Sequence, residues 1–477
     1  MNKEIIGALK QILGEDAVLW RPEDLLLYEY DGSVELARPD GVVFPRSTRD
    51  VVEIVRAANR YGVPLVGRGA GTGLSGGALA PQGGIVLVFS RMNRILEVDY
   101  ENQRAVVQPG VVNWELTRAV EHAGLYFAPD PSSQKACTIG GNVAENAGGP
   151  HTLAYGVTSH HVTGLELVLP DGDVIRVGGK TFEPTGYDLT RLLVGSEGTL
   201  AIVTEITVRL LPQPEAVKTL LAVYDAVDDA TETVVEITAR GITPAACEML
   251  DGWTLRVVED YIHAGFPTDS VAVLLIEVEG LREAVEAQAE EISEVCRLHR
   301  ARELRVARDA RERDLLWKGR KNAFGAIGRV SPSYYVQDGV IPRTKLSVTL
   351  QRITEIGQKF GFQIGNIFHA GDGNLHPIIL FDQRNQAEFE RAAAAASAIM
   401  RLCVEMGGAL TGEHGIGMEK NEMMPLLFSE ADLDLMKRVH SAFNPAGRLN
   451  PGKLFPSGKG CGEIRARPLP VAASSQA

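Results

Sequence analysis

Four clusters of glycine residues constrain the fold of this chain more than any other feature of its sequence. They read GRGAGTGLSGG at 67–77, TIGGNVAENAGG at 138–149, VGSEGTL at 194–200 and TGEHGIG at 411–417. Glycine has no Cβ atom, so it lets the backbone take positive φ angles or approach another group closely. The clusters therefore predict loops that close tightly around a ligand or another segment.

The first cluster contains a GxGxxG pattern at 71–76 after a predicted strand, so a dinucleotide-binding Rossmann unit has to be considered. In that fingerprint the third glycine opens a helix. Here the sequence GALAPQGG follows, and its proline and glycines disfavour a helix. A Rossmann fold is therefore not expected. The main-chain N–H groups of such a loop can still bind a phosphate.

The composition is that of a globular protein, with 45% hydrophobic and 23% charged residues. The apolar runs are too short to span a bilayer, and residues 1–20 have an amphipathic, acid-containing pattern that differs from a secretory signal. We therefore expect no direct membrane insertion and a location in the cytoplasm, or at the inner membrane through partner subunits. The net charge of −13 argues against a nucleic-acid-binding protein, which usually has a basic surface.

The cysteines are scattered along the chain, at Cys137, Cys247, Cys296, Cys403 and Cys461. They form no CxxC pair, so neither an iron–sulfur cluster nor a structural zinc site is expected within the chain. If electrons leave this protein for an iron–sulfur cluster, another chain carries that cluster.

The order of the predicted elements indicates an α+β protein. A helix and lead-in are expected at residues 1–37, and a strand, a helix and a strand follow at 41–69. Short alternating strands then dominate residues 85–208, with the glycine clusters between them. We expect these two α/β parts to form one domain over residues 38–215.

A proline-marked boundary separates this domain from a second one, expected over residues 216–456. In it, strands alternate with long helices, such as the one predicted at 281–300, and an antiparallel sheet is expected. Residues 457–477 are rich in Pro, Ser and Ala and are predicted to form a loose tail.

The sequence HAGDGNLH at 369–376 holds two histidines on either side of a turn. Its apolar, β-branched flanks predict two strands, and Asp372-Gly373 predicts a hairpin between them. A turn centred there pairs His369 with His376, and directly opposed residues have Cβ atoms roughly 4.5–5.5 Å apart. The pair can then bind one metal ion. A solvent-exposed strand face with two histidines is the alternative, and a third ligand would decide between them.

Several motifs in this chain resemble the vanillyl-alcohol oxidase/PCMH superfamily of flavoproteins. PLVGRGAGTGLSGGA, PDPSSQKACTIGGNVAENAGG and VGSEGTLAIVTE are similar, in this order, to its FAD-binding domain. HAGDGNLHP, TGEHGIGMEK and NPAGRLNPGKLFP are similar to its C-terminal FAD-linked oxidase domain. The likeness is strongest to the branch that contains FAD-binding subunits of bacterial glycolate oxidases and the D-lactate and D-2-hydroxyglutarate dehydrogenases.

The resemblance implies a PCMH-type FAD-binding domain made of two α/β subdomains, with FAD held by the glycine clusters. The implied cofactor-binding residues are Arg68, Gly69, Gly71, Thr72, Gly73, Ser75, Pro129, Ser132, Thr138, Gly141, Asn142, Asn146, Gly195, Glu197, Gly198, Ile202 and Asn450. Many members attach FAD covalently through a histidine of the first loop, and this loop contains none. We therefore expect non-covalent FAD.

Glu413, in the fourth glycine cluster, is the candidate third ligand beside His369 and His376. Two imidazoles and one carboxylate with an open fourth position are typical of catalytic zinc, and the corresponding residues of related 2-hydroxyacid dehydrogenases bind a divalent metal. His414 is the candidate base that removes the hydroxyl proton of the substrate. A further metal ligand or a supporting residue is the alternative role for His414.

Arg320 is the candidate partner for the substrate carboxylate, because related enzymes place an arginine on the corresponding helix and a guanidinium can bind a carboxylate in bidentate fashion. A surface charge is the alternative, and Lys318 or Lys321 could equally be solvated. Relatives that act on a five-carbon diacid have a lysine on the following strand, where this chain has Val336. We therefore expect a short D-2-hydroxy acid, glycolate or D-lactate, as substrate.

The predicted activity is the oxidation of this acid to the 2-oxo acid, with hydride transfer to flavin N5. Electrons are expected to pass to another acceptor, with iron–sulfur and second flavin-type subunits as the implied partners. One alternative is a dehydrogenase of another D-2-hydroxy acid. The other is a catalytically silent flavin-binding scaffold, which would not need His369, His376, Glu413 and His414.

Overall fold

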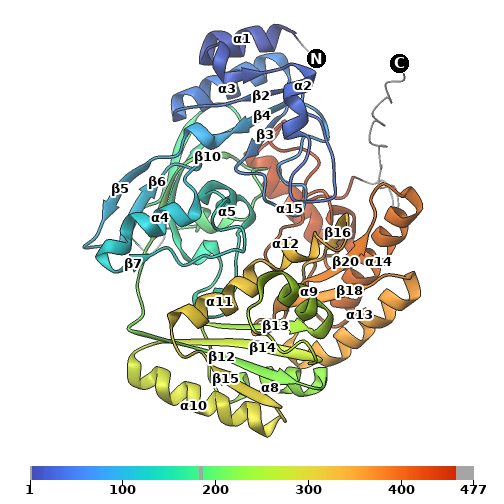
Figure 1. Cartoon of the computed structure of the whole chain (residues 1–477). Helices are drawn as coiled ribbons and strands as arrows, with labels where there is room; N and C mark the ends of the chain where they lie inside the picture. The colour runs from blue at the N-terminus through green and yellow to red at the C-terminus, as the bar shows by residue number, and fades with distance from the viewer. Residues whose placement is uncertain (1–2, 182–185, 458–477) are drawn as a thin grey trace, which may run out of the picture.

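The computed structural model of the chain describes residues 3–181 and 186–457. The predicted loose tail lies outside these residues except for Ser457. Figure 1 shows three regions built on β-sheets, with the N-terminal sheet at the top and the largest sheet at the bottom. The α+β class and the antiparallel sheet of the C-terminal domain are confirmed.

The N-terminal region is a four-stranded sheet covered by two helices. Strands β2, β4 and β3 are parallel, and β1 pairs with β2 in the antiparallel direction. The order in the sheet is β1 (Val18–Leu19), β2 (Gly41–Val43), β4 (Ile85–Val88), β3 (Leu65–Arg68). The predicted strand–helix–strand unit is thus present. The strand at 85–88, which was expected in the following region, lies in this sheet between β2 and β3.

Helix α3 (Thr48–Tyr61) connects the parallel strands β2 and β3, as a parallel pair requires a crossover. Ser47 begins it by accepting the main-chain N–H of Asp50, and Gly62 ends it in the left-handed conformation. Its buried face packs with helix α1 (Lys3–Leu13) in one apolar core. The N-terminal helix is therefore part of this region's core.

The second region is a five-stranded antiparallel sheet in the order β5-β6-β10-β8-β9. Helices α4 (Asn113–Val120) and α5 (Ile139–Glu145) contribute to its apolar core. The strands are β5 (Ile95–Asp99), β6 (Arg104–Val107), β8 (Val162–Val168), β9 (Val174–Gly178) and β10 (Ile202–Arg209). The shorter elements of this part of the chain are β7 (Leu125–Tyr126), α6 (Thr152–Tyr155), α7 (Leu189–Leu193) and β11 (Leu211–Pro212), whereas α2 (Pro22–Leu25) packs on the first sheet.

The C-terminal region is a large sheet with antiparallel pairing throughout. Its main order is β15-β12-β14-β13-β18-β19-β17, and β20 joins β18 to β16. The strands are β12 (Ala216–Tyr224), β13 (Ala246–Asp251), β14 (Ala272–Gly280), β15 (Glu303–Val306), β16 (Ser333–Val336), β17 (Gly339–Val340), β18 (Ile364–His369), β19 (Asn374–Leu375) and β20 (Pro377–Phe381).

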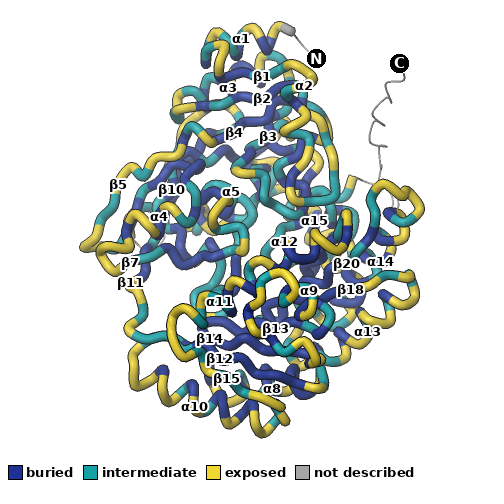
Figure 2. Tube along the Cα trace, in the orientation of Figure 1, coloured by how far each residue is buried: buried dark blue, intermediate teal, exposed yellow. Residues whose placement is uncertain are grey.

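Helices cover both faces of this sheet, so its strands are almost wholly buried (Figure 2). One apolar core contains the helices α8 (Val227–Ala239), α10 (Arg282–Leu298), α13 (Leu346–Phe360) and α14 (Gln386–Glu405). The core of the opposite face contains α9 (Gly252–Ile262), α11 (Ala310–Lys321) and α12 (Ala323–Ile327). The long helix predicted at 281–300 is α10.

The chain returns to the N-terminal region after helix α15 (Glu430–Phe443). Leu449 forms a parallel bridge with Leu65 on β3, the edge strand of the first sheet. The side-chain amide of Asn450 donates to the main-chain oxygens of Gly77 (3.0 Å) and Glu197 (2.7 Å). The C-terminal segment thus completes the glycine-rich part of the fold.

The described residues have two further features in common. None of their helices combines the length and the apolar character that crossing a membrane requires. Their four cysteines are buried and unpaired as thiols.

Candidate active site

A cavity of about 450 Å³ lies where the three regions meet. Its N-terminal wall consists of the first glycine cluster, the start of α5 and the loop before β10. The C-terminal region contributes Lys321, Phe324, Tyr334, His376, Glu413, His414, Leu449 and Asn450. The cavity therefore places the predicted cofactor-binding residues next to His376, Glu413 and His414, which were predicted to bind the metal or act as the base.

Most of the predicted cofactor-binding residues line this cavity. They are Arg68, Gly69, Gly71, Thr72, Gly73, Ser132, Thr138, Gly141, Asn142, Glu197, Gly198, Ile202 and Asn450. Four of the predicted residues, all within the described part of the chain, are not in its wall: Ser75, Pro129, Asn146 and Gly195. Two of the four take left-handed turns, Asn146 at φ 56° and Gly195 at φ 82°.

The first glycine cluster combines closely approaching backbone with polar atoms that lack partners, as a binding site for an extended, polar group requires. A Cβ atom on Gly71 would lie 2.2 Å from Nη2 of Arg68, and one on Gly69 would lie 2.4 Å from Oγ1 of Thr138. Nη1 of Arg68 and Oγ of Ser75 are buried without a hydrogen-bond partner within the chain. Because a buried polar atom without a partner is costly, Nη1 of Arg68, which lines the cavity, fits a site for the FAD pyrophosphate.

Glu197 joins two glycine clusters at the cavity wall. The main-chain N–H of Ile416 donates to its Oε1 (2.7 Å) and that of Gly417 to its Oε2 (2.8 Å). Glu197 itself takes φ 52°. This carboxylate fixes the fourth glycine cluster, which carries Glu413 and His414, against the FAD-binding region.

The three predicted metal ligands come together as expected. Oε1 of Glu413 lies 3.0 Å from Nε2 of His369 and 3.4 Å from Nε2 of His376. The two imidazole rings are 5.0 Å apart and nearly perpendicular. Nε2 of His376 is buried and makes no hydrogen bond within the described residues. Two imidazole nitrogens and a carboxylate oxygen that converge in this way fit a divalent metal.

The predicted register of the hairpin, however, is wrong by two positions. His369 pairs with Asn374 rather than with His376, and β18 and β20 continue the same register. The turn is centred on Gly371-Asp372, with Oδ1 of Asp372 accepting the N–H of Asn374 (3.0 Å). His376 is thus the diagonal neighbour of His369 on the same face, a position from which a long side chain still reaches.

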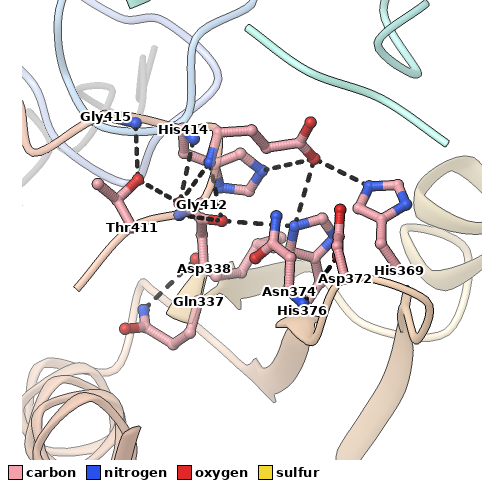
Figure 3. A network of polar contacts seen from close by, with 12 residues as sticks. Gln337, Asp338, His369, Asp372, Asn374, His376, Thr411, Gly412, His414 and Gly415 are labelled. Carbon is pink, nitrogen blue, oxygen red and sulfur yellow. Dashed lines mark hydrogen bonds and ion pairs between the residues drawn. The ribbon is translucent and has the colours of Figure 1, made fainter. Parts of the chain in front are cut away.

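Glu413 and His414 are held in place by the buried Asp338, which Figure 3 shows next to His414. The carboxylate of Asp338 accepts the main-chain N–H groups of Gly412 (3.0 Å), Glu413 (3.3 Å) and His414 (3.0 Å). Nζ of Lys420 lies 3.4 Å from its Oδ2. Asp338, His376 and His414 could form a second ligand set by distance alone. The carboxylate of Asp338 is already occupied by these donors, so His369, His376 and Glu413 form the better set.

Glu248 on β13 contacts the candidate metal ligand His369 at the ring nitrogen that does not face Glu413. It has no exposed surface, and its Oε1 lies 2.7 Å from Nδ1 of His369. Burial alone would lower the pKa of His369, but the carboxylates of Glu248 and Glu413 raise it well above its usual value. A carboxylate on Nδ1 directs Nε2 of a histidine toward a metal.

His414 lies in the cavity wall, with its ring stacked on His376 at 4.9 Å. Burial lowers the pKa of His414 to about 4, although Asp338 acts in the opposite direction. The imidazole is therefore neutral near pH 7, which is the form that a general base requires.

Arg320, the predicted partner for the substrate carboxylate, is paired with the buried Glu248. It is 2% exposed, its Nε donates to Oε2 of Glu248 at 2.6 Å, and it does not line the cavity in the described structure. Lys321, the next residue on α11, does line the cavity. Val336 is buried in the apolar core between the sheet and α11.

Sequence reasoning missed Asp338, Glu248 and Lys321. Glu248 has a signal, since it is a single charged residue within the apolar run ACEML at 246–250. Asp338 resembles an ordinary turn residue because a glycine follows it. The sequence alone does not distinguish Lys321 from the neighbouring charged residues that face solvent, because the orientation of the helix decides which of them reaches the cavity.

Comparisons with known proteins agree with this geometry. A family model described as an FAD binding domain matches residues 39–178. Another, described as FAD linked oxidases, C-terminal domain, matches residues 213–454. The structure is also similar to p-cresol methylhydroxylase, with a TM-score of 0.81 and 18% identity, covering 95% of this chain and 96% of the other. At this identity the likeness concerns the fold alone.

Several curated proteins are similar over nearly the whole chain. Glycolate oxidase subunit GlcD of Escherichia coli is 44% identical over 463 residues, covering 97% of this chain and 93% of the relative. The protein of the same name from Bacillus subtilis is 44% identical, covering 95% and 97%. D-lactate dehydrogenase of Archaeoglobus fulgidus is 35% identical, covering 90% and 95%. This chain therefore belongs to the family of FAD-linked oxidases.

Proposed function

We propose that this FAD-dependent oxidoreductase converts a short D-2-hydroxy acid, glycolate or D-lactate, to the 2-oxo acid. One observation carries the proposal. The cavity lined by the flavin-binding glycine clusters also contains His376, Glu413 and His414, so a single small molecule can contact the flavin, the metal and a base. The relatives named above act in the same reaction class, as their names state.

The chain's own residues divide the work as follows. His369, His376 and Glu413 hold a divalent metal, for which zinc fits the two imidazoles and the open position. When bound, the metal would supply a Lewis acid for the substrate hydroxyl, and the non-covalent FAD would supply the hydride acceptor. His414 takes the hydroxyl proton at its ring, and the Glu197 contacts hold the loop that carries it.

The choice of a short monocarboxylate rests on the cavity wall. Phe324 and Tyr334 stack on each other at 6.2 Å and close the wall next to Lys321. Val336 lies in the apolar core and not in the cavity wall, so position 336 offers no cation for a second carboxylate. Another D-2-hydroxy acid of similar size is the second candidate. A catalytically silent scaffold is not favoured, because it would not need a neutral base beside a metal site.

The electron acceptor and the location of the protein are part of this proposal. The relatives from Escherichia coli and Bacillus subtilis are named as subunits. We infer that electrons pass from the flavin to an iron–sulfur subunit and a second flavin-type subunit. We also infer a cytoplasmic location, at the inner membrane where such subunits attach it.

The proposal is tested by metal analysis and an absorption spectrum of the purified protein, followed by anaerobic titration with glycolate, D-lactate and L-lactate. Glycolate or D-lactate should bleach the flavin with one equivalent of 2-oxo acid formed. A flavoprotein that none of these or longer D-2-hydroxy acids reduces would reject the proposed function.

A further inference from the structure

Glu145 is a titratable residue of the cavity wall that the chemistry proposed above does not use. It is the last residue of helix α5 and lines the cavity. Its Oε2 atom is buried and has no hydrogen-bond partner within the described residues. Because a buried polar atom without a partner is costly, the FAD expected in this cavity is the candidate partner of Glu145.

Two glycine clusters leave room for this carboxyl group. A Cβ atom on Gly77, in the first cluster, would overlap with Oε1 of Glu145. A Cβ atom on Gly415, in the fourth cluster, would overlap with Oε2 of the same side chain. The carboxyl group of Glu145 therefore lies between the cluster that is expected to bind FAD and the loop that carries His414.

A second carboxyl group, that of Glu197, lies close to Glu145. Oε2 of Glu145 and Oε1 of Glu197 are both less than 3.0 Å from the position that a Cβ atom on Gly415 would take. The oxygens of Glu197 accept the main-chain N–H groups of Ile416 and Gly417, which favours the charged form of Glu197. Oε2 of Glu145 has no such donor. Since two adjacent carboxyl groups do not readily ionise together, Glu145 is the one that keeps its proton.

The charges around Glu145 act in the same direction. Burial, followed by the charges of Glu197 and Asp31, raises the pKa of Glu145 well above its usual value. Lys453 and Lys420 lower this pKa by smaller effects. The carboxyl group of Glu145 is therefore neutral near pH 7.

Both lysines have other partners. Nζ of Lys453 donates to the main-chain oxygen of Leu79 at 2.8 Å. Nζ of Lys420 lies 3.4 Å from Oδ2 of the buried Asp338. Neither contact involves Glu145, so its carboxyl group is not the partner that holds these cations in place.

Bound FAD favours the same neutral form of Glu145. The pyrophosphate of FAD is negatively charged, and Arg68 is the cation expected to bind it. An ionised Glu145 in the same cavity would repel this charge. A neutral carboxyl group avoids the repulsion, and its O–H can donate to an acceptor atom of the cofactor.

We propose that Glu145 binds FAD as a neutral carboxylic acid that donates a hydrogen bond to the cofactor. The inference concerns the FAD site alone and does not depend on the substrate. A hydrogen bond that is lost from a buried site corresponds to at least about fivefold in affinity.

The first test is an infrared difference spectrum between the FAD-loaded parent and FAD-loaded Glu145→Gln at pH 8. The parent should show the carbonyl stretching band of a protonated carboxyl group, and Glu145→Gln should lack it. Glu115→Gln, at an exposed position of α4, is the control and should remove carboxylate bands only. If Glu145→Gln also removes carboxylate bands only, Glu145 is ionised and the inference is wrong.

The second test measures the dissociation constant of FAD, from the fluorescence of the flavin that the FAD-loaded protein releases on dilution. Glu145→Gln is neutral and keeps a donor, so its FAD affinity should stay within about threefold of the parent. Glu145→Leu has no donor and should bind FAD at least about fivefold more weakly. Glu115→Gln should match the parent.

Three affinity results would also overturn the inference. Tighter binding by Glu145→Gln, beyond threefold, would indicate an ionised carboxylate that repels FAD. Weaker binding by Glu145→Gln, beyond threefold, would indicate an ionised carboxylate that the site requires. Parent-like binding by Glu145→Leu would show that Glu145 does not contact FAD. The infrared test does not need Glu145→Leu to fold, and a parent flavin that no 2-hydroxy acid reduces would reject the proposed function without changing any of these results.

Discussion

Nδ1 of His369 lies 2.7 Å from Oε1 of Glu248, a carboxylate with no exposed surface. This contact determines which ring nitrogen is free, and Nε2 faces Oε1 of Glu413 at 3.0 Å. The ligand set is thus oriented before a metal binds. Arg320 on helix α11 contacts the other oxygen of Glu248. Helix α11 is therefore connected to the candidate metal ligand His369 through Glu248.

The first prediction concerns the flavin linkage. We expect FAD to leave the protein intact when the polypeptide is denatured and precipitated, because the first glycine cluster contains no histidine for attachment. The measurement is the flavin absorbance and mass in the supernatant. Flavin that remains with the precipitated chain would show a covalent bond.

The second prediction separates the two cofactors. Replacing His369 or His376 by Ala should remove the metal and leave FAD in place, since the glycine clusters hold the flavin. The loss of metal affinity should exceed the roughly 10- to 100-fold that an outer partner costs. Metal content and flavin absorbance of the same samples give the answer. His122→Ala, at an exposed position, is the control. A variant that loses metal and FAD together would show that the hairpin has a structural role.

The third prediction concerns His414. His414→Gln should keep metal and FAD, because neither needs this imidazole, while Glu413→Gln should lose metal. Flavin reduction by D-lactate in a single anaerobic turnover should slow by about 10²–10⁴-fold, the usual contribution of a positioned base. If His414→Gln is purified without metal, or reduces its flavin at the parent rate, His414 is not the base.

The fourth prediction addresses Asp338. In Asp338→Asn the amide replaces one acceptor oxygen, and Lys420 loses its buried counter-ion. We expect the free energy of unfolding to fall by about 3–5 kcal/mol, the usual cost of breaking a buried ion pair on one side. Urea denaturation measures this change. Asp434→Asn, at an exposed ion pair on α15, should change the stability by less than about 1 kcal/mol.

The fifth prediction is a pH dependence that involves His151. Its pKa in the folded state is about 10, above the usual value of about 6.5. The folded state therefore keeps a proton that the unfolded state releases, and the stabilisation present below pH 6.5 is lost as the pH rises toward 10. One such group changes the free energy of unfolding by at most about 1.4 kcal/mol per pH unit.

His151→Gln removes this proton but can still hydrogen-bond to Asp130. Free energies of unfolding of the parent and the variant are compared from pH 6.5 to 9.5, so that other titrating groups cancel. The parent should lose its advantage over His151→Gln as the pH rises. Parallel curves would mean that His151 has an ordinary pKa.

The sequence predicted those features that depend on local patterns. The strand–helix–strand unit at 41–68, helix α10 and the antiparallel strands β12 and β14 all follow from alternation, helical periodicity and turn residues. The three candidate metal ligands also lie together, because two of them are close in sequence and the third is in a glycine-rich loop. The family resemblance located the cavity wall around Gly71 and Asn450.

Features that depend on tertiary contacts were not predictable. The turn at 370–373 contains two possible centres, and the main-chain bond from Gly373 to the oxygen of His369 (3.1 Å) is decided by the neighbouring strands. The difference between Arg320 and Lys321 depends on the rotation of α11 against β13. Glu248 belongs to another strand 121 positions away from His369.

The bridge between Leu449 and Leu65 has a consequence for the order in which the protein matures. The side chain of Asn450 contacts Gly77, 373 positions earlier in the chain, and Nζ of Lys453 donates to the main-chain oxygen of Leu79 at 2.8 Å. While the chain emerges from the ribosome, its N-terminal region lacks these contacts until residues 449–453 have been made. The cavity wall at Leu449 and Asn450 is therefore incomplete until this segment has been made.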